Sequence, residues 1–196
     1  MKPSSWLMVA LGAGVAGLLV ARSSKKVPQT TVSAIVDAPL AATFDYIVPV
    51  DLTRIFLGTV LIPAIVDMSI KDGWNKPGLV RTITFADGST SQESLLTVRA
   101  PTSFSYQNEG FTSLPLRLLL QRLEGEWHFT EPRDGRTNIE WTYRAVPVNG
   151  LARVLVQLVL MPQVRTMLTN ALAILKDDLN RMHYPAVKAR MERVSA

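Results

Sequence analysis

Two side chains of opposite charge are the best candidates for a polar functional site in this sequence. Arg81 alternates with apolar residues at positions 79, 83 and 85, so it shares their face of an expected strand. The segment 86–88 fits a three-residue hairpin loop with its glycine in the left-handed conformation, which places Arg81 directly opposite Glu93. A two-residue loop would place them on opposite faces. The pair is either a salt bridge between strands or a polar anchor for a ligand head group, with Tyr106 or Tyr143 as hydroxyl partners.

Other catalytic and metal-binding chemistry has little support. The chain has no cysteine, which excludes thiol catalysis, thiolate metal sites and disulfides. His128 falls on the polar face of its expected strand, and His183 lies near the end of the expected last helix, where a cation suits the helix dipole. No HExxH, phosphate-binding loop or glycine-rich dinucleotide motif is present. We therefore expect no catalytic residue, no metal site and no cofactor.

The positive charge of the chain is concentrated at its start. The net charge is +5, and four of the 21 basic residues lie in the first 26 positions, ahead of all 16 acidic residues. The remaining 17 basic residues (21 less four) nearly balance those 16 acids. A nucleic-acid partner is therefore not expected.

The amino terminus has the composition of a membrane anchor. From Pro3 to Ala21 there is no charged residue, and a helix of that length spans about 28 Å, close to the roughly 30 Å hydrocarbon core of a bilayer. Residues 1–26 are thus predicted to be a single-pass transmembrane helix with a basic flank. The cations Arg22, Lys25 and Lys26 would hold the flank and the folded domain on the cytoplasmic side. The alternative is a cleaved signal peptide with a poor cleavage site at 21–23, which would export the domain. Small residues at positions 12, 13, 16 and 17 have the spacing that pairs membrane helices, which allows a homodimer.

The rest of the chain predicts a strand, two short helices, six strands and one long helix. The first strand covers Gln29–Val36; Asp37 fits the N-cap of a helix over Leu40–Val48, and a second helix runs from Asp51 to about Val60. Turn signals then separate six strands, expected over 64–71, 79–85, 91–99, 104–108, 122–131 and 137–146. The apolar segment 111–120, which contains a proline, is expected to be a loop.

The long helix is predicted over Leu151–Met182 from an apolar stripe at three- and four-residue steps. The stripe includes Val154, Leu158 and Met161, and Pro162 is expected to bend the helix. The part before this proline is apolar almost all round, so it has more apolar surface than one sheet can cover.

This element order, together with short motifs, resembles the helix-grip proteins, the START-like or SRPBCC superfamily. The superfamily includes plant Bet v 1-type proteins and bacterial polyketide cyclase and lipid-transport members. The matching runs are Gly78–Ile83, Asp87–Gly88, Glu93–Leu95 and Ser105–Tyr106, and the likeness covers about residues 30–182. It implies an α+β domain over 27–184, followed by a basic tail over 185–196. In this fold a seven-stranded antiparallel sheet curls around a long C-terminal helix, with two short helices after the first strand and an apolar cavity between sheet and long helix.

The resemblance also locates the mouth of that cavity. In helix-grip relatives, three connections surround the mouth, and element order maps them to segments 86–89, 110–121 and 146–150 here. The linker Arg22–Gln29 spans at most about 28 Å, so an anchor would hold the mouth near the membrane surface.

The expected function is the membrane-anchored binding or transport of a hydrophobic small molecule, a lipid or isoprenoid-like compound, without chemical conversion. The expected ligand-binding residues are Arg81, Phe85, Glu93, Leu95, Tyr106, Trp127, Trp141, Tyr143, Leu158 and Leu168. One alternative is an enzyme of the polyketide cyclase or dehydratase kind, which requires Arg81, Glu93 or Tyr106 to be unpaired. The other is an interaction protein whose cavity is filled by its own side chains, and the lack of a continuous void would favour it.

Overall fold

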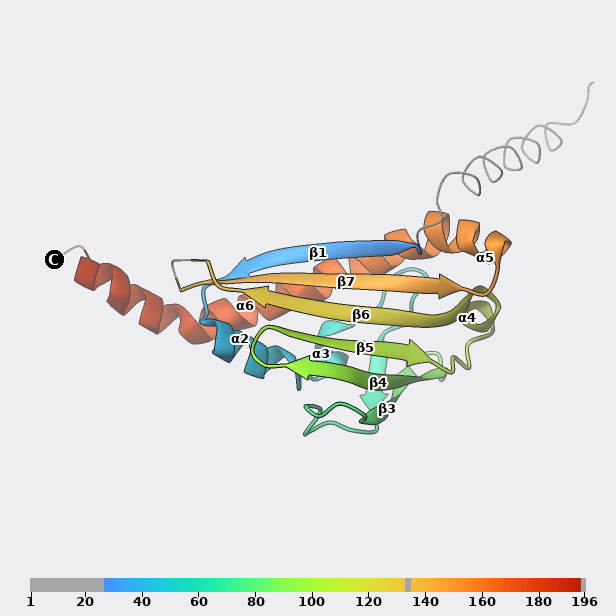
Figure 1. The fold of residues 1–196 in the computed structure, drawn as a ribbon, viewed down its shortest axis with the longest axis horizontal. Helices are drawn as coiled ribbons and strands as arrows, with labels where there is room; N and C mark the ends of the chain where they lie inside the picture. The colour runs from blue at the N-terminus through green and yellow to red at the C-terminus, as the bar shows by residue number, and fades with distance from the viewer. Residues whose placement is uncertain (1–26, 133–134, 195–196) are drawn as a thin grey trace, which may run out of the picture.

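The computed structural model describes residues 27–132 and 135–194, with side chains described as far as His183. Seven strands form one sheet, and a long helix crosses one side of it (Figure 1). The strands are β1 (Gln29–Val36), β2 (Ile65–Met68), β3 (Val80–Phe85), β4 (Thr90–Arg99), β5 (Ser103–Glu109), β6 (Leu120–Thr130) and β7 (Thr137–Pro147). The helices are α2 (Leu40–Ile47), α3 (Leu52–Ile55), α4 (Leu114–Leu119), α5 (Gly150–Leu155), η1 (Val156–Leu160) and α6 (Met161–Val194). The predicted α+β fold is confirmed.

The sheet has the strand order β1-β7-β6-β5-β4-β3-β2, and all neighbours are antiparallel. Consecutive strands from β2 to β7 therefore lie side by side, and β1 closes the outer edge of β7. Alternate residues of the long strands are buried on the inner face of the sheet, as in β7, where Ile139, Trp141 and Tyr143 are buried. One covered face and one wet face give the alternation from which these strands were predicted.

The two short helices differ from their predicted bounds. The N-cap residue of α2 is Pro39, not Asp37, whose backbone N–H donates to Asn180 Oδ1 of α6 at 2.8 Å instead. Asp51 does cap α3, because its carboxylate accepts from the Thr53 N–H at 2.9 Å. This helix ends at Ile55 rather than near residue 60, since Gly58 takes a φ of +85° that a helix cannot continue through.

The apolar segment expected to be a loop contains the helix α4. Its proline lies in the first turn, where a missing N–H costs no helical hydrogen bond, so the proline does not prevent the helix. None of its side chains is buried. Leu116 and Leu119 are half-buried and pack against the core, whereas Leu114 and Leu118 are exposed.

The long helix is continuous from Gly150 to Val194 but contains the π-turn η1 at Val156–Leu160. Pro162 follows, and its ring and missing N–H disrupt the normal hydrogen bond to the carbonyl four residues earlier, so the backbone widens there. Asn149 begins the helix by accepting from the Ala152 N–H at 2.8 Å. The backbone of α6 extends into the segment expected to be a separate basic tail.

The predicted transmembrane helix over residues 1–26 lies outside the described residues. Among those described, Gly150–His183 is long and apolar enough to cross a bilayer by length and composition, but here it is the core helix on which the sheet packs.

One end of the sheet gathers four connections, and we call it the α4–α5 end. It comprises residues 27–28 before β1 and the connections 56–64, 86–89, 110–119 and 148–160. Strand register brings them together, because Gln29 pairs with Arg144 and Leu120 pairs with Pro147. Hydrogen bonds join them as well, from the residue 86 N–H to the residue 64 carbonyl at 2.9 Å and from the residue 148 N–H to the residue 119 carbonyl at 3.1 Å. The three segments that were mapped to the cavity mouth thus lie at one end of the domain.

Candidate functional site

Arg81 and Glu93 form a buried ion pair on the inner face of the sheet. The register pairs them directly, and Gly88 has the left-handed φ of +80° expected of the three-residue loop. The Arg81 Nε donates to Glu93 Oε1 at 2.7 Å, and Nη2 lies 2.6 Å from the same oxygen. The two side chains are only 3% and 5% exposed. The predicted geometry of the pair is therefore present.

The surroundings of this pair are part polar and part aromatic. The Trp74 ring lies under the Arg81 guanidinium, 4.2 Å from its central carbon. Burial raises the pKa of Glu93, while Arg81 and the amide of Asn108 act in the opposite direction. Arg81 Nη1 and Asn108 Oδ1 are buried without a hydrogen-bond partner. A buried donor and acceptor that lack partners are unusual in a protein core.

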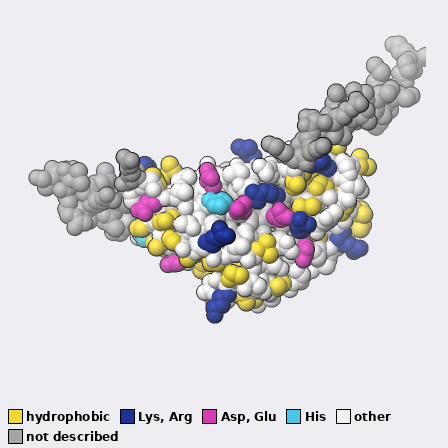
Figure 2. Space-filling model, in the orientation of Figure 1, with side chains coloured by type: hydrophobic (Ala, Val, Ile, Leu, Met, Phe, Trp, Pro, Cys, Tyr) yellow, Lys and Arg dark blue, Asp and Glu magenta, His cyan; other side chains and the backbone are white. Residues whose placement is uncertain are grey.

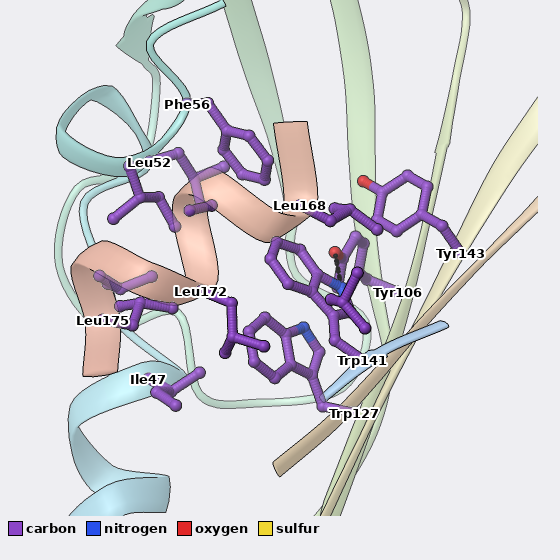
Figure 3. Close-up of a cluster of buried hydrophobic side chains, with 14 of the residues drawn as sticks. Ile47, Leu52, Phe56, Tyr106, Trp127, Trp141, Tyr143, Leu168, Leu172 and Leu175 are labelled. Carbon is purple, nitrogen blue, oxygen red and sulfur yellow. Dashed lines mark hydrogen bonds between the residues drawn. The ribbon is translucent and has the colours of Figure 1, made fainter. Parts of the chain in front are cut away.

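A tyrosine–tryptophan cluster lies beside the ion pair (Figure 3). The Trp141 Nε1–H donates to the Tyr106 hydroxyl at 3.1 Å, and the rings of Trp127 and Trp141 stack with centroids 4.0 Å apart. Burial raises the pKa of both Tyr106 and Tyr143, so both phenols stay neutral. Their hydroxyls are hydrogen-bond groups and not bases at ordinary pH.

Gly125 on β6 makes room for the Tyr106 ring. It is paired with Tyr106 across the sheet, and a Cβ at this position would overlap the phenol ring. Only glycine lets the ring lie flat over the neighbouring strand. The position of the Tyr106 hydroxyl therefore depends on a residue with no side chain.

The space between the sheet, the α2–α3 segment and α6 is nearly filled. A cavity of about 20 Å³ remains there, and its walls include Arg81, Glu93, Tyr106, Trp127 and Trp141. That volume holds about one water molecule. The α2–α3 segment supplies the opposite wall, with Ile47, Val48, Val50, Leu52, Ile55 and Phe56. Five of the ten expected ligand-binding residues thus line the cavity, which is far smaller than expected.

The other five expected residues lie elsewhere. Leu95, Tyr143 and Leu168 are buried in the core but do not line this cavity, and Phe85 is half-buried near the β2 edge. Leu158 is 56% exposed, so its expected place on the cavity wall is wrong.

The π-turn explains the misplacement of Leu158. A π-turn adds one residue to a helix, so a stripe extended back from α6 at regular helical spacing no longer marks the buried positions within and before the turn. Ala152, Val156 and Leu160 are buried, whereas the stripe predicted for a regular helix runs through Val154 and Leu158.

Several residues of the site were not predicted. Phe104 and Asn108 alternate with Tyr106 on β5, so strand parity could have found them. Gly125 interrupts the apolar alternation of β6, which was a usable signal. Trp74 lies in the irregular connection between β2 and β3, where no periodic pattern indicates burial.

Comparisons with solved structures agree with this architecture. A point mutant of norcoclaurine synthase from Thalictrum flavum, in complex with a transition-state analogue, matches with a TM-score of 0.55 at 15% identity, over 80% of this chain and 99% of that one. Ara h 8.0201 matches with a TM-score of 0.54 at 20% identity, over 80% and 97% of the two chains. The protein XoxI of Bacillus cereus matches with a TM-score of 0.54 at 14% identity, over 77% and 94%. At these identities the matches show a shared fold.

A comparison with curated proteins found no match. The model of one protein family, described as polyketide cyclase / dehydrase and lipid transport, matches residues 28–180. This match runs from β1 into α6 and includes the ion pair, the aromatic cluster and the α2–α3 wall. The chain therefore belongs to the polyketide cyclase / dehydrase and lipid transport family, within the SRPBCC helix-grip superfamily.

Proposed function

We propose that this domain binds a hydrophobic small molecule, a lipid or isoprenoid-like compound, between the sheet and the α2–α3 segment. The observation that carries the proposal is the buried Arg81–Glu93 pair with the partnerless Arg81 Nη1 in an otherwise aromatic environment. Replacing a buried ion pair with apolar side chains is often neutral or stabilising, so packing alone does not require this pair. A ligand-binding site does use a few polar groups in an apolar pocket.

The charge of the pair narrows the chemistry of the ligand. Glu93 already neutralises the guanidinium, and a second anion beside it would be repelled. The Arg81 Nη1 is a donor in need of an acceptor. A ligand with an uncharged acceptor oxygen, a carbonyl or hydroxyl attached to an apolar body, satisfies this donor without adding charge.

Ligand entry requires the cavity to open, because small-molecule pockets measure about 300–1,000 Å³ and this one has about 20 Å³. We propose that the α2–α3 wall moves to open the cavity. Helix α3 has four residues, and its Arg54 contacts Asp178 of α6 at 2.7 Å, as does the Tyr46 hydroxyl of α2 at 2.8 Å. Breaking the contacts of Arg54 and Tyr46 with Asp178 would let Phe56 and its neighbours move away from the aromatic cluster.

The test is mass spectrometry of compounds that co-purify with the full chain in mild detergent. A reproducible neutral lipid-like species should be retained by the wild type and by Arg99→Met, which removes an exposed arginine from the same sheet. It should be lost from Arg81→Met/Glu93→Met, a double variant without the polar pair. Equal retention by the double variant would refute the role of the pair, and no species above that of an unrelated membrane protein would refute the binding function.

The enzyme alternative loses support from the geometry. It requires Arg81, Glu93 or Tyr106 to be free for a substrate, yet Arg81 pairs with Glu93 and Tyr106 accepts from Trp141. The family description includes cyclases and dehydrases, but no pair of groups in this cavity is poised for acid–base chemistry.

The interaction-protein alternative has one specific observation in its favour, the nearly filled cavity of about 20 Å³. In that case the core serves only stability and function lies on the surface. This alternative would be favoured if no compound co-purified with the protein and if the double variant still bound the same partner as the wild type.

The cellular setting is also a proposal. The uncharged segment 3–21 and the cations after it support a single-pass anchor with the domain in the cytoplasm, and a homodimer through small residues of that segment. Protease protection in sealed inside-out vesicles tests this orientation, since a cytoplasmic domain is cut without lysis and an exported one is not.

A further inference from the structure

Exposed apolar side chains are concentrated at the α4–α5 end. Sixteen large hydrophobic side chains are exposed among the described residues, and eleven lie at this end, at position 27 and within 57–61, 114–118 and 148–159. Val60 is 93% exposed and Leu151 75%. Figure 2 shows hydrophobic side chains together with basic side chains (Lys or Arg) toward the right-hand end, where Figure 1 has α4 and α5. Contiguous apolar surface of this kind marks a site of contact.

The connections at this end have few charged residues, and their net charge is +1 (two arginines less one aspartate). Connection 56–64 has no charged residue, 110–119 has only Arg117, and 148–160 has only Arg153. Asp87 is the one acid in the four connections. An apolar surface with cations at its rim is complementary to an anionic lipid leaflet, where each cation near the surface adds to the attraction.

The chain enters the domain at the same end. Gln29 begins β1 beside Arg144, shortly before α5, and the cations of the predicted membrane flank precede it within eight residues. That length spans at most about 28 Å. An anchored domain would therefore have this end within reach of the bilayer.

The composition of the patch favours lipid over a protein partner. Every exposed large hydrophobic residue of the described chain is Val, Ile, Leu or Met, and none is aromatic. Protein interfaces rely on aromatic anchors in central pockets. Aliphatic side chains spread over four connections suit contact with acyl chains, which need no matching pockets.

We propose that the α4–α5 end is a membrane-docking face, which inserts its aliphatic side chains into the interface of an anionic bilayer. The face includes the connection 56–64, which directly follows the α2–α3 wall of the cavity. Docking would thus place that wall against lipid, but the contact does not depend on whether a ligand binds.

The absence of cysteine from the chain makes the test direct. Spin labels are attached to Val60→Cys, Leu155→Cys and Ile35→Cys in the full chain, reconstituted in vesicles of phosphatidylcholine with phosphatidylserine. Leu155 and Ile35 are matched, because they are 45% and 44% exposed, but Ile35 lies at the opposite end of β1. Collision rates with lipid-soluble oxygen and with a water-soluble nickel chelate report depth.

We expect oxygen-to-nickel collision ratios several-fold higher at positions 60 and 155 than at 35. Arg117→Gln should lower the ratio at 155 in anionic vesicles more than in vesicles of phosphatidylcholine alone. Equal ratios at the three positions would overturn the proposal. Protection of position 155 from both reagents would also overturn it, because it indicates that a protein covers this position. Spin–spin broadening that disappears on dilution with unlabelled chain would overturn it too, because it indicates contact with a second copy. None of these readouts depends on ligand retention, so this proposal and the binding function fail separately.

Discussion

Removal of the Arg81 guanidinium should destabilise the domain strongly, and by an amount that depends on pH. Arg81→Met leaves the Glu93 carboxyl buried without its cation. The domain then either holds a buried anion or protonates it. Protonating a carboxyl of ordinary pKa about 4.3 at pH 7 costs about 3.7 kcal/mol, at 1.36 kcal/mol for each pH unit. We therefore expect a loss of about 3–4 kcal/mol at pH 7.

The pH dependence has a defined sign. In the variant, burial raises the pKa of Glu93 without Arg81 to oppose it, so the folded state binds this proton more tightly than the unfolded state. Unfolding free energy then falls as pH rises between the unfolded and folded pKa values. As pH falls from 7, the difference between wild type and variant should shrink by about 1.4 kcal/mol for each unit, down to the folded-state pKa of Glu93 in the wild type, which burial also raises.

The assay is urea unfolding of the full chain in one detergent at pH 5, 6 and 7, followed by tryptophan fluorescence and far-ultraviolet circular dichroism. Arg99→Met is the matched control, and as an exposed change it should stay within about 0.5 kcal/mol of wild type. Arg81→Met/Glu93→Met should recover to within about 1 kcal/mol, because neither charge is left alone. If Arg81→Met lowered the unfolding free energy at pH 7 by less than about 1 kcal/mol, or by an amount independent of pH, the variant would not contain a buried and uncompensated Glu93 charge, and the reasoning would be refuted.

Two further predictions concern the supports of the site. Gly125→Ala should displace the Tyr106 ring that packs on this glycine. It should lower the unfolding free energy by about 1–3 kcal/mol and change the fluorescence of the neighbouring tryptophans. An unchanged spectrum and an unchanged stability would contradict the close contact. The hydrogen bond from Tyr46, and then the one from Arg54, lower the pKa of Asp178, so its contribution is present above the ordinary carboxyl pKa and lost as pH falls. Asp178→Asn should therefore lower the unfolding free energy by about 1 kcal/mol or less at pH 7 and should not change it near pH 2. The control Asp177→Asn, at an exposed position, should change stability at neither pH. Equal losses from both variants would show that the contacts of Asp178 with Tyr46 and Arg54 contribute nothing to stability.

The ion pair was predictable because strand parity and one loop length fix a register. Arg81 and Glu93 follow from alternation and from Gly88, and both are local properties of the sequence. Trp74 is different, because its position results from the tertiary path of an irregular connection. The cavity volume is also beyond sequence patterns, since it is a small difference between the space enclosed and the volume of many side chains. Leu158 was misplaced because hydrophobic periodicity assumes a regular helix, and η1 is not one.

Because of the π-turn η1, the set of side chains exposed on α5 depends on the number of residues in the segment Val156–Leu160. Deleting a single codon within Val156–Leu160 would restore regular helical geometry and rotate the residues before it by about 100° relative to α6. Leucines now in solvent, such as Leu151 and Leu155, would then exchange positions with their buried neighbours Ala152 and Val156, although no side chain had been substituted. A relative one residue shorter here would keep every strand and the ion pair and yet expose different side chains in the α5 part of the α4–α5 end.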